Sequence, residues 1–179
     1  IHRWYPEGEG EPEVVVLGVH GFNDYGASFE TLSRALTKEG IAVYAYDQRG
    51  FGDTERKGIW AGQDTLIADL DTVARLLRAR YPGKPLYIVG KSMGGVRASD
   101  DPEVLRALSR DPLVLKGARV DTLYGLSELM NTALARAADL SVPTLMLYGA
   151  HDEVIPPQAM CRLLNRLPQG RWPWRMAVY

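Results

Sequence analysis

The stretch Leu86–Gly95 reads LYIVGKSMGG and carries the strongest structural signal in the chain. Its first four residues are apolar and partly β-branched, which predicts a short buried strand, and the next six predict a sharp turn into a helix. A nucleophilic serine on such a turn has a strained backbone, and side chains two positions before and after it would collide. Glycine is therefore needed at Gly90 and Gly94 if Ser92 is a nucleophile. By itself, the pattern also fits a plain turn after a strand.

Composition limits the classes of function that remain open. The 179 residues suffice for one domain with a sizeable core, and 46% hydrophobic with 24% charged residues is ordinary for a globular protein. A formal net charge of -1 gives no attraction for nucleic acid. Cys161 is the only cysteine, so neither a disulfide framework nor a thiolate metal cluster is expected. No apolar run approaches the roughly 18 residues of a spanning helix. A cytoplasmic location is the default expectation, and a lost N-terminal targeting segment stays open as an alternative because the sequence starts at Ile1 rather than at Met.

Strand and helix patterns alternate along the first half of the chain. Short loops between them predict a mostly parallel sheet with helices on both faces, which is an α/β fold. Ser28 is the expected N-cap of the first helix and Gly40 its end. Strands are predicted over residues 13–19, 41–46, 86–89, 142–148 and 174–179, and helices over 28–40, 64–80, 122–138 and from Pro156 onward. The buried face of the 64–80 helix is predicted to carry Leu66, Ile67, Leu70, Val73, Leu76 and Leu77.

Four motifs close four of these strands. They are HGF at residues 20–22, YDQRGFG at 46–52, GKSMGG at 90–95 and LYGAHD at 147–152. In this order they resemble the α/β-hydrolases, specifically the branch of monoacylglycerol lipases and lysophospholipases. The resemblance implies a single α/β-hydrolase core over residues 1–179.

The chain departs from this family in two places. In the family the helix after the nucleophile runs for several turns and leads to a further strand and a cap domain, whereas here a polar, turn-like stretch follows Gly95. We therefore expect a segment to be missing near Val96/Arg97, either deleted or left out of the sequence. The family's catalytic histidine lies just beyond the strand that here ends at Tyr179. The expected fold thus lacks the cap and the C-terminal histidine segment.

The resemblance also implies roles for individual residues. Ser92 would be the nucleophile, and Asp152 the acid that orients a histidine and stabilises its charged form. Asp152 could instead be a loop carboxylate that caps the helix beginning near Pro156. The backbone N–H groups of Phe22 and Met93 would form the oxyanion hole, one from each loop.

Charged and polar neighbours of these residues are given supporting roles. The resemblance implies that His20 braces the oxyanion loop. Lys91 stands where the family usually carries His or Glu, and it is interpreted as a solvated neighbour of the turn. Asp47 and Arg49 are expected to tie loops together, with a surface ion pair as the alternative. His151 is expected to be a surface residue.

The function implied by the resemblance is hydrolysis of carboxylic esters through an acyl-enzyme on Ser92. The substrate would be a small ester of a single-chain acyl lipid, such as a monoacylglycerol or a lysophospholipid, with peripheral contact to lipid surfaces. No cofactor, metal or nucleic acid is expected. Two alternatives stay open: a non-catalytic binding or scaffold protein of the same fold that lacks its base, and a serine aminopeptidase of that fold.

Overall fold

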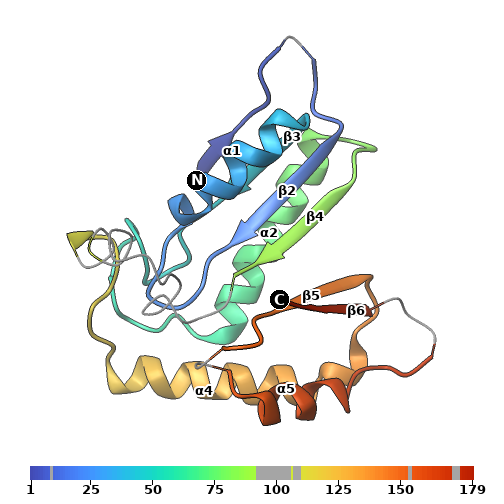
Figure 1. Ribbon diagram of the computed structural model, residues 1–179. Helices are drawn as coiled ribbons and strands as arrows, with labels where there is room; N and C mark the ends of the chain where they lie inside the picture. Colours follow the sequence, from blue (N-terminus) through green and yellow to red (C-terminus); the bar gives the residue numbers. More distant parts are fainter. Residues whose placement is uncertain (9, 92–105, 107–109, 153–154, 171–173) are drawn as a thin grey trace. The chain divides into compact units, whose positions relative to one another are not determined.

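The computed structural model describes residues 1–8, 10–91, 106, 110–152, 155–170 and 174–179 (Figure 1). Contacts between these residues divide the chain into two compact units, Ile1–Gly125 and Leu126–Tyr179. Each unit contains its own sheet.

The first unit is built on a four-stranded sheet with the spatial order β1-β3-β2-β4. Its members are β1 (His2–Trp4), β2 (Val14–Val19), β3 (Ile41–Ala45) and β4 (Leu86–Gly90). Strand β2 pairs in parallel with β3 on one side and with β4 on the other, whereas β1 is antiparallel to β3. The strands follow the apolar runs in the sequence, and the predicted mostly parallel sheet is confirmed.

Helices cover both faces of this sheet. On one face, Leu77 of α2 (Gln63–Arg80) joins Val15 and Leu17 of β2 in a buried cluster. On the other face, the Phe29 ring of η1 (Gly26–Phe29) lies 3.0 Å from the point where Gly18 would carry a Cβ atom. Because alternate residues of a strand face opposite sides, these contacts lie on opposite faces of β2. Helix α1 (Glu30–Lys38) continues directly from η1.

The first helical segment begins differently from the prediction. Ser28 is not its N-cap, since coiling already starts at Gly26 and Ser28 lies inside the η1 turn. The Gly26 N–H donates to the Asp47 carboxylate at 2.7 Å, so an acceptor distant in sequence satisfies the free end of the helix. The predicted end is confirmed: α1 stops at Lys38, and Gly40 has a φ of 75°.

Two predictions of burial are wrong. Tyr87 and Ile88 of β4 are 60% and 53% exposed, because β4 lies at the edge of the sheet formed by the described strands. On α2, Ile67 and Leu76 are exposed, whereas Leu66 and Leu77 are buried. The apolar stripe of α2 that packs on the sheet is therefore narrower than the apolar face predicted from the sequence.

Helix α4 (Val120–Ala135) crosses from the first unit into the second. The second unit then contains η2 (Ala137–Asp139), β5 (Thr144–Tyr148), α5 (Pro157–Leu164) and β6 (Trp174–Val178). Strands β5 and β6 pair in parallel. Proline at the first position of α5 needs no N–H partner there, which explains why the predicted start is correct. None of the helices within the described residues has the length and apolar character needed to cross a membrane.

Candidate active site

The carboxyl ends of β2, β3 and β4 meet at one edge of the first sheet, as parallel pairing requires. The loops that follow β2 and β3 carry the HGF and YDQRGFG motifs. The Lys91 N–H donates to the Val19 carbonyl at 3.0 Å, which extends the pairing of β2 with β4 to the residue before Ser92. Ser92, Met93, Gly94 and the Val96/Arg97 junction lie outside the described residues, so their roles stay predictions.

His20 is buried at 3% exposure and connects the first two of these loops. Its Nε2 accepts the Gln48 N–H at 2.9 Å, so Nδ1 must carry the proton that it donates to the Gly21 carbonyl at 2.7 Å. The Gln48 side chain in turn donates to the His20 carbonyl at 2.7 Å. Burial lowers the pKa of the His20 imidazole. The ring is therefore a fixed, neutral brace of the loop that carries Phe22.

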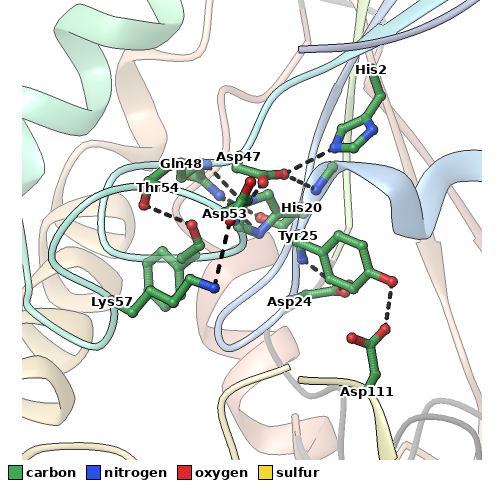
Figure 2. A network of polar contacts seen from close by, with 12 residues as sticks. His2, His20, Asp24, Tyr25, Asp47, Gln48, Asp53, Thr54, Lys57 and Asp111 are labelled. Atoms are coloured by element: carbon green, nitrogen blue, oxygen red, sulfur yellow. Dashed lines mark hydrogen bonds and ion pairs between the residues drawn. The ribbon is translucent and has the colours of Figure 1, made fainter. Parts of the chain in front are cut away.

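Asp47 is the centre of a second set of contacts at this edge (Figure 2). Its Oδ1 accepts the Gly26 N–H, its Oδ2 accepts the Asp53 N–H at 2.8 Å, and His2 Nε2 lies 3.3 Å from Oδ1. Burial alone would raise the pKa of this carboxyl, but the hydrogen bonds from Asp53 and Gly26 outweigh it and the pKa is lowered. Asp47 therefore ties three segments of the chain together as a carboxylate.

Arg49, from the same motif, has a different role. It forms an ion pair with Asp69 of α2 at 2.6 Å, and its side chain is 64% exposed. The pair matches the surface alternative, and such exposed pairs contribute little to stability.

Phe22 is held by its side chain. It is 7% exposed, and its ring meets that of Phe51 edge-on at a centroid distance of 5.5 Å. The Phe51 ring also meets His20 edge-on at 5.8 Å. None of the hydrogen bonds between described residues uses the Phe22 N–H. The packing thus fixes the loop through its side chains.

The same loop is also held by residues 111–115 of the first unit. The Tyr25 hydroxyl donates to the Asp111 carboxylate (Figure 2), and the Leu115 N–H donates to the Asn23 carbonyl at 3.2 Å. The hydrogen bond to Asp111, together with burial, raises the pKa of Tyr25 to about 12. Asn23 has a φ of 61°, which is uncommon for a residue other than glycine and marks a sharp bend.

The position of Lys91 in the sequence predicted a solvated side chain, but the structure shows that it has a charged partner. Its Nζ lies 3.0 Å from Oδ2 of Asp24, a carboxylate with a side-chain exposure of only 9%. No local sequence pattern connects these two residues, which are 67 positions apart. Gln48 and Tyr25 were likewise missed, because only their tertiary contacts distinguish them from ordinary loop residues.

Asp152 belongs to the second unit and follows β5. Its Oδ1 accepts the Ile155 N–H at 2.9 Å, and its own N–H donates to the Gly149 carbonyl at 3.1 Å. The Tyr148 hydroxyl donates to the Ile155 carbonyl at 2.7 Å, which closes this turn. The carboxylate is half-buried and shapes the approach to α5, while the neighbouring His151 is exposed.

Among the residues that the structure describes, no group of three or more His, Cys, Asp or Glu side chains could hold a metal ion.

Comparison with known proteins agrees with the motifs. The family described as "Serine aminopeptidase, S33" matches residues 10–100 and 96–172. A putative monoglyceride lipase of Schizosaccharomyces pombe is 34% identical over 90 residues, which are 48% of this chain and 23% of that protein. A monoacylglycerol lipase of Mycolicibacterium smegmatis is 24% identical over 224 residues, covering 92% of this chain and 78% of the relative. The matched part thus spans less than a quarter of the first relative. The second alignment is longer than the 179-residue chain itself, so the relative contains residues without a counterpart here.

The fold agrees with solved structures as well. A thermostable carboxyl esterase from Bacillus coagulans superimposes with a TM-score of 0.82 at 16% identity, covering 99% of this chain and 84% of the esterase. This likeness shows the fold alone, and it confirms the predicted α/β-hydrolase class. The family model matches far more than half of the 179 residues of this chain. The chain therefore belongs to the serine aminopeptidase S33 family of the α/β-hydrolase fold.

Proposed function

We propose that the whole protein is a serine hydrolase that cleaves carboxylic esters of single-chain acyl lipids, of the monoacylglycerol or lysophospholipid kind. The observation that carries this proposal is the meeting of the β2 and β4 ends. The bond between Lys91 and Val19 at 3.0 Å brings the backbone that leads to Ser92 beside the backbone that leads to Phe22. Acyl transfer needs this adjacency, because nucleophile and oxyanion donors must reach one carbonyl.

The proposed reaction has two steps. The Ser92 hydroxyl attacks the ester carbonyl and loses its proton to a histidine, and the N–H groups of Phe22 and Met93 stabilise the oxyanion. The alcohol leaves with that proton, and water then releases the fatty acid from Ser92. Asp152 would hold the imidazole in its working tautomer.

The base itself is not one of the histidines held in the first unit. His20 already uses both ring nitrogens, and His2 lies against Asp47. The proposed base is a histidine outside the first unit, so the proposal concerns the whole protein. The names of two relatives support a lipid ester as the substrate, since one is a putative monoglyceride lipase and the other a monoacylglycerol lipase.

The test is turnover by the full-length protein of a p-nitrophenyl ester and of a monoacylglycerol. Replacing Ser92→Ala should lower kcat on the order of 10⁴-fold or more, because the covalent route is lost. The matched control is Ser127→Ala, an exposed serine of α4, which should leave turnover unchanged. Equal turnover by the Ser92 variant would refute the proposal. Hydrolysis of aminoacyl p-nitroanilides in place of esters would favour an aminopeptidase.

A further inference from the structure

Lys91 connects the two loops of the candidate site through its backbone and its side chain. Its N–H extends the pairing of β4 with β2. Its ammonium lies 3.0 Å from Asp24 on the loop that follows β2, and its side chain is 39% exposed. One residue, directly before Ser92, is thus attached at two points to the segment that contains Phe22.

Asp24 uses both carboxylate oxygens in this arrangement. Oδ1 accepts the Tyr25 N–H at 2.9 Å, and Oδ2 accepts from Lys91. The Asp24 N–H donates to the Gly21 carbonyl at 3.4 Å, which closes a turn around Phe22. A carboxylate so little exposed has lost much of its hydration and needs a charged partner to compensate. The ion pair therefore restrains the whole turn from Gly21 to Tyr25.

We infer that Lys91 is a positioning residue for the proposed hydrolysis, and that its ion pair with Asp24 fixes the Phe22 N–H relative to the strand end that carries Ser92. This inference rests on the proposed function. An ammonium bound to a carboxylate has no lone pair with which to take a proton, so Lys91 acts through geometry. Oxyanion donors act mainly in the transition state, so a displaced Phe22 N–H should affect kcat more than KM.

The experiment compares variants of the full-length protein. Lys91→Met removes the charge and keeps the length, Lys91→Arg keeps the charge, and Lys91→Met with Asp24→Asn removes both charges. The control is Arg34→Met, which breaks an exposed ion pair with Glu30 on α1. Amide hydrogen exchange over residues 21–25 is measured together with kcat and KM for a p-nitrophenyl ester.

For Lys91→Met we expect about tenfold faster exchange in the loop and about tenfold lower kcat, less than the loss of a whole oxyanion donor, with KM within about twofold. Lys91→Arg should restore most of the slow exchange and most of kcat. The double variant should recover part of the lost kcat and of the slow exchange, because no unpaired buried carboxylate remains. Arg34→Met should match the wild type.

Each contrary result has a distinct meaning. Unchanged exchange in Lys91→Met would overturn the inference whether or not the protein is active. Faster exchange with unchanged kcat in an active protein would also overturn it, because the pair would then be structural only. Absence of Ser92-dependent turnover in the wild type would refute the proposed function, and the positioning role of Lys91 in it as well.

Discussion

At the scale of single residues, His20 has one tautomer because its two ring nitrogens meet different partners. Nε2 accepts a backbone N–H and Nδ1 donates to a carbonyl, so a second proton would place a donor against the Gln48 N–H. Burial works in the same direction and lowers the pKa of the imidazole. The histidine of the HGF motif is therefore a neutral structural brace, in agreement with what the family resemblance implied.

This predicts a dependence of stability on pH. In the unfolded chain an imidazole has a pKa of about 6.5, above its value in the folded protein. As pH falls below about 6.5, the unfolded chain binds a proton that the folded one rejects, so the free energy of unfolding decreases until the folded pKa is passed. Above about pH 6.5 the imidazole is neutral in both states, so His20 does not make the free energy of unfolding depend on pH. Calorimetric Tm values from about pH 8 to 5 should fall more steeply for the wild type than for His20→Gln. The control His151→Gln, at an exposed position, should keep the wild-type slope. Equal slopes in all three proteins would contradict this account of His20.

At the scale of elements, the first turns of α4 depend on close contact with the loop that precedes α2. Thr122 is 1% exposed, and its hydroxyl donates to the Gly58 carbonyl at 2.9 Å. Gly125 is buried, and a Cβ atom there would overlap the Trp60 indole. The glycine is thus required by packing, although it lies inside a helix.

The substitution Gly125→Ala tests this contact through the sign of the change in the free energy of unfolding. Alanine is the better helix former by about 1 kcal/mol, so an unconstrained helix would gain stability. Because the methyl group overlaps Trp60, we expect instead a loss of about 1–3 kcal/mol in the free energy of unfolding, measured by urea denaturation. Gly117→Ala, where a Cβ atom meets nothing within 4 Å, is the control and should have little effect. A stabilised Gly125 variant would show that the contact with Trp60 is unimportant.

The elements themselves were largely predictable from hydrophobic pattern and from turn residues. Strand β2 and the end of α1 at Gly40 follow local signals that tertiary contacts reinforce. The start of η1, which leads into α1, was not predictable, because the N–H of its first residue, Gly26, is bound by Asp47, 21 residues away in the sequence. The exposure of Tyr87 and Ile88 was missed for a related reason: an apolar run does not reveal whether its strand has a neighbour on each side.

At the scale of the whole molecule, the motifs predicted which loops meet but not how they are joined. Parallel strands necessarily bring the ends of β2, β3 and β4 to one edge, so the meeting of the HGF and YDQRGFG loops followed from topology. The contacts of Lys91 with Asp24 and of Tyr25 with Asp111 depend on side-chain positions across 67 and 86 residues, for which no local pattern exists. The missing segment expected at Val96/Arg97 stays a prediction. This junction lies within the overlap of the two family matches, 10–100 and 96–172.

Covalent labelling shows whether Ser92 is the nucleophile of an ester hydrolase. The full-length protein is treated with a serine-reactive phosphonate, digested, and analysed by mass spectrometry while ester turnover is followed. We expect one adduct, on the peptide that contains Ser92, with turnover lost in proportion to labelling. Turnover that persists after full labelling of Ser92, or an inactivating adduct on a different serine, would contradict it.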